Sequence, residues 1–287
     1  MKSVWEVLKD VLELSKVKIT VAVSFTTLTG YILAREGIDT DFILPTLGIF
    51  LLACGSSVIN HLQEYRTDAK MRRTRKRPIP SGKVSPRSAS LLALFQVAVG
   101  SLLLLYGANV TAMVLGLIAL VWYNVVYTNL KKITPHAVVP GSIIGAIPPL
   151  VGWVSAGGSL MNPNAWVMAF FFFIWQVPHF YLLVLKYGQQ YEAAGFPSLT
   201  QRYSMAQMKR IIFSWTLATV LAALLLPMTG LISSVIAFSG LIISGIWLVG
   251  VFIKLLRADN ELSPGKYFMR INYYVLSIIV FLAIDHI

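Results

Sequence analysis

Three polar side chains recur at four-residue intervals where an apolar stretch ends: Asn60, Glu64 and Asp68. On a helix this spacing places all three on one face, over about 12 Å at 1.5 Å per residue. Carboxylate and amide oxygens suit Mg²⁺, which proteins commonly hold with one or two carboxylates and the phosphates of a substrate. Acidic groups beside a membrane span are costly without partners, so this stripe indicates a functional site.

A run of cations follows the stripe directly and consists of Lys70, Arg72, Arg73, Arg75, Lys76 and Arg77. Because Arg and Lys neutralise phosphate oxygens, the stripe and the run together favour a site for a magnesium-bound diphosphate. The alternative is a loop that only binds lipid headgroups and orients the chain, with the carboxylates as its ion-pair partners. That alternative suits the cations at 75–77 better than it suits two carboxylates at helical spacing.

A second polar segment, residues 186–197, contains the amides Gln189 and Gln190 and the carboxylate Glu192. Before it, Pro178 interrupts an apolar stretch, which frees backbone carbonyls and kinks a helix. Such breaks are tolerated where helices line a cavity. The segment is therefore the second candidate part of the site.

The elements that must position these groups are membrane-spanning helices. Of 287 residues, 56% are hydrophobic, and the mean hydropathy is +0.71, so lipid must contact most of the surface. A hydrocarbon core of about 30 Å takes roughly 20 apolar residues in a helix. Nine stretches approximately meet this test: Lys18 to Ala34, Phe42 to His61, Ser88 to Tyr106, Asn109 to Thr128, Ala137 to Ala156, Ala165 to Lys186, Ile211 to Met228, Leu231 to Leu255 and Tyr267 to Ile284.

The net charge of +12 lies between these stretches, where Lys and Arg mark the cytoplasmic side of a membrane. A cytoplasmic N-terminus sorts nearly all of them to that side and leaves Arg35 alone on the other, which requires an odd number of spans. The charge thus indicates a bilayer and no nucleic acid as partner. The cytoplasmic set is Lys2, Lys9, Lys16, Lys18, Lys131, Lys132 and the basic residues of 66–87, 186–210 and 254–270.

We therefore predict an all-α, polytopic membrane protein that forms one domain over residues 1–287. It has a cytosolic N-terminal segment, 1–16, and two cytosolic active-site loops, 63–87 and 187–210. Acidic residues in the N-terminal segment argue against a transit peptide, and it has no signal-type cleavage site, so we expect a multi-pass protein of a prokaryotic plasma (inner) membrane. Cys54 lies in an apolar run and is expected to be a buried small hydrophobe.

Several further motifs lie along the chain, at Ser15 to Lys18, Phe25 to Gly30, Met71, Arg73, Thr74, Arg77, Pro78, Gly82, Ser85, Tyr127, Thr128, Lys131, Lys132, Thr134, Pro135, Gly141, Pro149 to Trp153, Pro178 to Phe180, Tyr191 and Ala194 to Pro197. Together they resemble the UbiA superfamily of intramembrane prenyltransferases, and within it the haem O synthase (protohaem IX farnesyltransferase) family. The resemblance covers most of the chain. Two departures matter: Glu64 stands where Asp is common, and Gln190 stands where an Asp of the second motif is expected.

The resemblance implies nine helices around a central cavity that opens to lipid, and transfer of a farnesyl group from farnesyl diphosphate to a vinyl group of haem b. It implies Mg²⁺ on Asn60, Glu64 and Asp68, and a contribution of Gln190 and Glu192 to catalysis. The implied diphosphate ligands are Lys18, Arg73, Lys131 and Lys132. The implied acceptor-binding residues are His179, Tyr181 and Trp175, with His61 and His136 as further candidates.

Tyr127, Trp175 and Tyr181 could also stabilise an allylic cation through their ring faces. Haem A synthase or the assembly of a terminal oxidase are the implied partners.

Three alternatives stay open at this point. A prenyltransferase of the same kind could use a quinone precursor, a chlorin or a lipid as its acceptor. Gln190 fits a catalytically silent homologue that only binds haem. A secondary transporter also has many spans, but here the acidic groups gather at one membrane face and not at the midplane.

Overall fold

The computed structural model describes residues 3–257 and 263–287, and this part of the chain folds into helices with no strand. Lys2, which belongs to the predicted basic set, lies outside the described residues, as do Met1 and residues 258–262. The helices of the first half are α1 Val4–Leu14, α2 Val17–Arg35, α3 Ile43–Asp68, α4 Pro86–Gly107, α5 Val110–Val121, α6 Thr128–Leu130, α7 Val138–Gly141 and α8 Ile143–Ser155. Those of the second half are α9 Pro163–Ala193, α10 Met205–Ala223, α11 Leu225–Met228, α12 Val235–Arg257 and α13 Pro264–His286.

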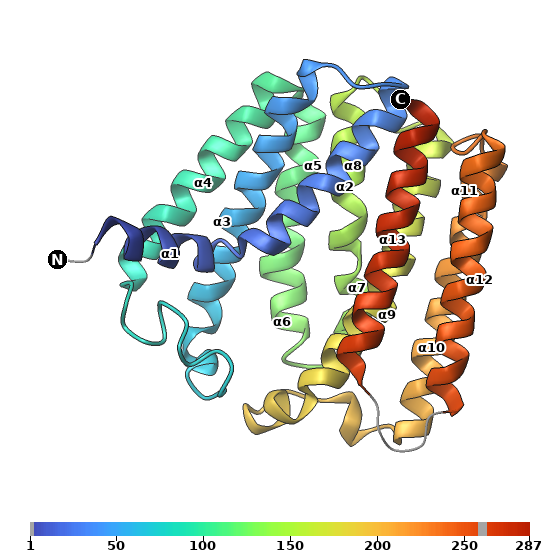
Figure 1. Cartoon of the computed structure of the whole chain (residues 1–287). Coiled ribbons are helices and arrows are strands. Elements are labelled where there is room, and N and C mark those ends of the chain that lie inside the picture. Colours follow the sequence, from blue (N-terminus) through green and yellow to red (C-terminus); the bar gives the residue numbers. More distant parts are fainter. Residues whose placement is uncertain (1–2, 258–262) are drawn as a thin grey trace.

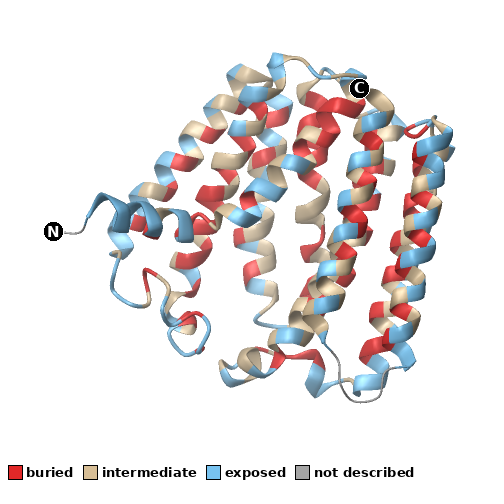
Figure 2. Cartoon of the chain, in the orientation of Figure 1, coloured by how far each residue is buried: buried red, intermediate tan, exposed pale blue. Residues whose placement is uncertain are grey.

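Nine helical segments of the described chain are long and apolar enough to cross a membrane, which confirms the predicted fold class. They run side by side as one bundle (Figure 1). Figure 2 shows that exposed residues lie along the outer faces of these helices, and many of them are large and apolar, as expected for a surface that lipid covers.

Two spans extend further than the apolar stretches predict. α3 continues to Asp68, beyond the expected end at His61, and α9 continues to Ala193. The predicted loops at 63–87 and 187–210 therefore begin later, after α3 and α9 end. As a consequence, Glu64 and Asp68 lie on a helix, as their spacing predicts.

Close backbone contact joins α2 to α8. A Cβ atom on Gly152 would overlap the carbonyl oxygen of Thr27, and one on Gly30 would overlap the carbonyl oxygen of Pro149. Small residues let helix backbones approach in membranes, where packing and not the hydrophobic effect holds helices together. This contact fixes the position of α2, whose first turn adjoins the polar stripe of α3.

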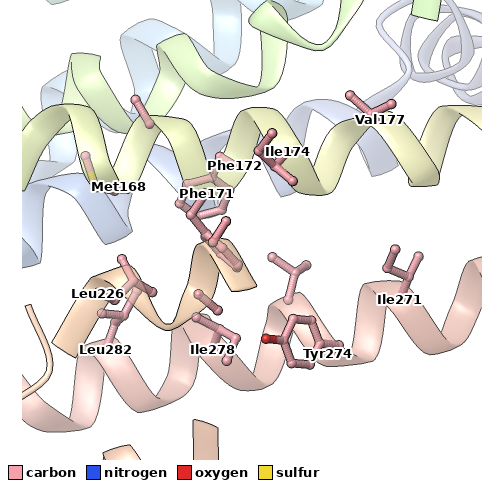
Figure 3. Packing of buried hydrophobic residues seen from close by; sticks show 14 of the residues in the cluster. Met168, Phe171, Phe172, Ile174, Val177, Leu226, Ile271, Tyr274, Ile278 and Leu282 are labelled. Atoms are coloured by element: carbon pink, nitrogen blue, oxygen red, sulfur yellow. The ribbon is translucent and has the colours of Figure 1, made fainter. Parts of the chain in front are cut away.

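The largest core cluster contains residues from most of the helices, and Figure 3 shows the part of it where α9, α11 and α13 meet. Phe171 and Phe172 of α9 are fully buried, as are Ile278 and Tyr274 of α13. This packing fixes α13 against α9, which carries the second polar segment at its end.

Two backbone irregularities adjoin the stripe. Lys16, between α1 and α2, has φ 48° and ψ 47°, a left-handed conformation that non-glycine residues seldom adopt. Residues Trp122–Tyr127 after α5 form a π-helix, a feature that often marks functional sites. Both irregularities place side chains against Asn60, as described next.

Candidate active site

The polar stripe of α3 is buried. Asn60, Glu64 and Asp68 are only 2%, 7% and 1% exposed. The two carboxylates form ion pairs with cations from elsewhere in the chain: Glu64 Oε1 lies 2.6 Å from Lys131 Nζ, and Asp68 Oδ2 lies 2.6 Å from Arg77 Nη1.

The third residue of the stripe, Asn60, forms hydrogen bonds with three other side chains. Its Oδ1 accepts hydrogen bonds from Lys16 Nζ at 2.9 Å and from the Tyr123 hydroxyl at 3.2 Å, and its Nδ2 donates to Thr128 Oγ1 at 3.3 Å. Lys16 Nζ also donates to the Tyr123 hydroxyl at 3.3 Å. The side chain of Asn60 is thus held on both of its polar atoms.

Side chains also bond to the backbone of the π-helix that carries Tyr123. Thr128 Oγ1 donates to the carbonyl of Tyr123 at 2.9 Å, and Gln63 Nε2 donates to the carbonyl of Asn124 at 2.9 Å. The bond from Gln63 joins the π-helical segment to α3.

Three cations therefore lie beside the two carboxylates and the amide of the stripe. We call this group the charge cluster; its members are Lys16, Asn60, Glu64, Asp68, Arg77 and Lys131. Burial is the main cause that lowers the pKa of Lys16 to about 7, and the nearby charges of Arg77 and Lys131 lower it further. Burial also opposes the charge of Lys131, but the Glu64 carboxylate outweighs it, so the pKa of Lys131 is raised. The excess of positive charge favours an anionic ligand.

The residues of the charge cluster fit Mg²⁺ that is shared with a diphosphate. No group of three or more His, Cys, Asp or Glu side chains that could hold a metal occurs among residues 3–257 and 263–287. Two carboxylates and one amide on a single helix face are instead an incomplete set of ligands, of the kind that binds Mg²⁺ when substrate phosphates supply the remaining oxygen ligands. The adjacent cations suit those same phosphates.

The structure places the four predicted diphosphate ligands differently. Lys131 belongs to the charge cluster, whereas the side chains of Lys18, Arg73 and Lys132 are exposed. Lys16 and Arg77 were not among the predicted diphosphate ligands, although Arg77 belongs to the basic run that the sequence places beside the stripe. The signal was available, because both residues lie within the motifs that carry the family resemblance.

The end of α9 lies close to the charge cluster. Arg73 places its guanidinium over the ring of Tyr187, 4.5 Å from the centroid. A small pocket of about 50 Å³ is lined by Tyr127 and Lys131 and also by Tyr191 and Phe196 of the second polar segment. The two predicted polar segments therefore meet, as expected for parts of one site.

The two predicted residues of the second motif have different surroundings. Gln190 is half-buried, and its Oε1 is buried without a hydrogen-bond partner among the described residues. Glu192 accepts a hydrogen bond from the hydroxyl of Thr200. Glu192 therefore connects α9 to the segment that follows it.

A ladder of aromatic rings leads from the charge cluster to the middle of α9. Tyr123 stacks on Tyr127 with 5.8 Å between ring centroids, and Tyr127 stacks on Phe180 at 5.9 Å. Lys131 Nζ lies 5.5 Å from the centroid of Tyr127. We call these three rings the aromatic ladder.

Of the predicted acceptor-binding residues, His179 contacts the aromatic ladder, Trp175 contacts His179, and Tyr181 lies in the hydrophobic core. His179 packs against Phe180 and Trp175, and the Nε1 of Trp175 is buried without a partner among the described residues. Tyr181 is 4% exposed and belongs to the hydrophobic core.

Of the two further histidine candidates, one is buried and one is paired. His61, on α3, is 1% exposed, and neither ring nitrogen has a partner in the described part of the chain. The Nε2 of His136 lies 3.2 Å from the hydroxyl of Tyr203.

Comparison with known proteins adds the family. The model of the UbiA prenyltransferase family matches residues 23–274. The chain is 36% identical to protoheme IX farnesyltransferase 1 of Pseudomonas fluorescens, over 99% of this chain and 94% of that protein. It is 33% identical to protoheme IX farnesyltransferase of Marinobacter nauticus, over 97% of this chain and 92% of that protein.

Solved structures share the fold at lower identity. A digeranylgeranylglyceryl phosphate synthase superposes with a TM-score of 0.79 at 19% identity, over 98% of this chain and 99% of that chain. A UbiA homologue from Archaeoglobus fulgidus, bound to GPP and Mg²⁺, superposes with a TM-score of 0.67 at 14% identity, over 95% and 98% of the two chains. The family match spans most of the chain, and the relatives align over nearly its full length, so the chain belongs to the UbiA prenyltransferase family.

Proposed function

We propose that this protein transfers the farnesyl group of farnesyl diphosphate to a vinyl group of haem b, which gives haem O. The observation that carries the proposal is the convergence of Glu64 and Asp68 with Lys16, Arg77 and Lys131 in one buried cluster. The choice of donor and acceptor is supported by relatives named protoheme IX farnesyltransferase, which align over nearly the whole chain.

In this proposal Asn60, Glu64 and Asp68 would hold Mg²⁺, with phosphate oxygens of the substrate as its further ligands. The ion, when bound, neutralises negative charge on the leaving group. Lys131 and Arg77 then bind phosphate oxygens in place of their carboxylate partners, and Lys16 contributes a third positive charge beside Asn60. Because the charge on diphosphate grows as the allylic C–O bond breaks, these cations stabilise the transition state more than the bound substrate.

In the same proposal, the aromatic ladder lies beside C1 of the farnesyl group. Its ring faces stabilise an allylic cation, and its apolar surface keeps water away from that cation. The vinyl group attacks C1 of the farnesyl cation as diphosphate leaves, and one water then adds to the resulting carbocation and loses a proton. The products are the hydroxyethylfarnesyl substituent of haem O and diphosphate, and no redox step occurs.

We further propose that the face with the charge cluster lies in the cytoplasm and that the membrane is a plasma (inner) membrane. The support is the asymmetry of basic residues, since Arg35 is the exception on the other side. Haem A synthase or the assembly of a terminal oxidase are proposed as downstream partners, because haem O must pass to another membrane protein. Lys18, Arg73 and Lys132 stay proposed as outer contacts of the diphosphate.

A second candidate function is a catalytically silent haem-binding homologue. Gln190 favours it, since an amide replaces the acid expected in the second motif and Glu192 is bound to Thr200. The charge cluster weighs against it, because all of its predicted metal ligands are present.

The test is product formation by the full chain in lipid nanodiscs with farnesyl diphosphate, haem b and Mg²⁺. We expect haem O and diphosphate in equal amounts from the wild type, and at least about 10²-fold less from Asp68→Asn. An Asp285→Asn variant, which changes a carboxylate bonded to Ser233 and Ser234, serves as the control. Haem binding without any turnover by the wild type would favour the silent homologue, and prenylation of a quinone precursor without haem O would remove the proposed acceptor.

A further inference from the structure

Helix α1 lies beside the bundle of spans and is exposed along most of its length. In Figure 1 it projects from the side of the bundle where α2 begins, and Figure 2 shows most of its ribbon in the colour of exposed residues. Its 11 residues make a helix of about 16 Å, which is roughly half of a hydrocarbon core of about 30 Å. α1 therefore cannot cross a membrane as the spans do.

One side of α1 exposes large apolar residues. Trp5, Leu8 and Leu12 recur at intervals of three and four residues, which places them in one row along a helix. Trp5 is 73% exposed, and both leucines are exposed as well. We call this row the apolar stripe of α1. Because contact of such a row with water is unfavourable, the stripe indicates a surface that another molecule covers.

A row of charges lies next to the apolar stripe. Each residue of the stripe is followed by an exposed charged residue, and these are Glu6, Lys9 and Glu13. One residue corresponds to a rotation of about 100° on a helix, so the three charges form a second row. A short helix with an apolar side and a charged side is typical of the membrane interface, where it lies in the membrane plane with its apolar side toward the acyl chains and its charges in water.

The C-terminal end of α1 is fixed to the bundle. Leu14 is 1% exposed and packs with Ala89 and Ala93 of α4. The hydroxyl of Ser15, which follows α1, accepts a hydrogen bond from Gln96 Nε2 at 2.9 Å. These contacts determine the direction in which α1 leaves the bundle, and they therefore fix where its two sides face.

The surface beside this attachment faces lipid. α2 and α4 both begin next to the end of α1, and both are long and apolar enough to cross a membrane. Their first three turns expose large apolar side chains, namely Ile19 on α2, and Leu91 and Leu94 on α4. The apolar stripe of α1 therefore adjoins a surface that lipid covers.

We propose that α1 is an interfacial helix, and that its apolar stripe inserts into the lipid leaflet at the membrane face where α2 begins. The partner is the acyl region directly below the headgroups. Headgroup charge is not the attraction, because the exposed charged residues of α1 are two acids and one base. The inference concerns the membrane and does not depend on the proposed reaction. Since Lys16 follows closely after α1, the inserted helix also holds the segment that leads into the charge cluster.

The alternative is that α1 of a second copy covers the apolar stripe, so that the protein forms dimers. Spin labels on the full chain separate the two. The chain carries Cys54→Ala, which removes its one native cysteine, and single cysteines are then introduced at each position of the apolar stripe and of the charged row. Leu94→Cys, on the lipid-facing side of α4, and Arg202→Cys, exposed between α9 and α10, give the lipid and water references.

Each labelled protein is placed in nanodiscs of phosphatidylcholine, with or without phosphatidylserine. The measurement is the collision rate of the label with oxygen and with a water-soluble nickel complex. We expect the labels of the apolar stripe to lie about 5–10 Å into the boundary between headgroups and acyl chains, and to collide with nickel at least about five-fold less often than the labels of the charged row. Phosphatidylserine should change these rates by less than about two-fold.

Three results would overturn the inference. Equal access of nickel to both rows places α1 in water. Shielding of the apolar stripe from oxygen and nickel alike, with dipolar broadening between labels, identifies a second copy as the partner. Insertion only in the presence of phosphatidylserine identifies headgroup charge as the attraction.

A pair of substitutions tests the apolar stripe itself. With the label at position 5, Leu8→Gln together with Leu12→Gln should raise the nickel collision rate to that of the charged row, because glutamine maintains the helix but removes apolar area. Lys9→Gln together with Glu13→Gln is the matched control on the charged side and should change the rate by less than about two-fold. Equal effects of the two pairs exclude insertion through the apolar stripe.

Discussion

Lys131 Nζ lies 2.6 Å from Glu64 Oε1 and also over the ring of Tyr127. This one side chain therefore joins the acidic stripe of α3 to the aromatic ladder. A cation in that place can bind the diphosphate group of an allylic diphosphate whose allylic carbon contacts the aromatic ladder. The neighbouring Lys132 is exposed and bonds weakly to Asn129 at 3.5 Å.

The two adjacent lysines should differ in their effect on turnover. We expect Lys131→Met to lower kcat/KM about 10²- to 10³-fold, because a preorganised cation at the leaving group is lost. It should also destabilise the fold by about 3 kcal/mol, since Glu64 keeps a buried charge without its partner. Lys132→Met, measured in the same assay, should lower kcat/KM much less.

The double variant Lys131→Met with Glu64→Gln separates stability from catalysis. Removing both charges should restore most of the thermal stability, while turnover stays low. Equal turnover of the two single lysine variants would contradict the placement of Lys131.

Binding of the diphosphate should weaken as the pH rises through about 7. The pKa of Lys16 is lowered to about 7, mainly by burial, so the free protein holds this positive charge below pH 7 and loses it above. An anion binds the protonated form, and the dissociation constant should therefore increase by up to about ten-fold per pH unit above 7. The measurement is calorimetric titration with a non-reactive thio analogue of farnesyl diphosphate and Mg²⁺ between pH 6 and pH 9.

The control for this pH dependence is Lys16→Arg. Because Arg stays charged over the whole range, its binding curve should be flatter than that of the wild type. The same slope in both proteins would show that another group causes the change.

An alanine at Gly152 should destabilise the bundle. Its Cβ would overlap the carbonyl oxygen of Thr27 on α2, and overpacking of this kind costs about 1–3 kcal/mol. The expected result is a lower unfolding midpoint together with weaker diphosphate binding, because Lys16 directly precedes α2. Gly250→Ala is the matched control, since nothing lies within 4 Å of its added Cβ; a similar loss in both variants would contradict the close contact.

Leucine in place of Tyr127 should change the fate of the farnesyl cation. The ring stacks between Tyr123 and Phe180, and its loss removes a cation–π contact worth about 1–2 kcal/mol. We expect more farnesol relative to prenylated haem, measured by chromatography of the products, while Tyr127→Phe keeps the wild-type ratio. Tyr106→Leu, at a residue that is 81% exposed, should have no effect, and an unchanged ratio in Tyr127→Leu would remove the ladder from the mechanism.

The sequence by itself determined the spans and the polar stripe of this protein. Hydropathy is a property of consecutive residues, so the nine spans are visible without a structure. Helical periodicity is equally local, and it placed Asn60, Glu64 and Asp68 on one face before any contact was known. The prediction placed the ends of α3 and α9 too early, because hydropathy falls where the apolar stretch ends, while polar residues continue the helix beyond the hydrocarbon core.

Only the tertiary structure decided which partners meet that stripe. Lys16 and Lys18 have the same charge and lie in the same motif, yet the left-handed backbone at Lys16 directs that side chain to Asn60 and leaves Lys18 exposed. Likewise, the pairing of His179 with Asn272 depends on how α9 packs against α13. Such contacts depend on the angles and rotations of packed helices, which are set by the sum of many distant contacts and not by any local pattern of residues.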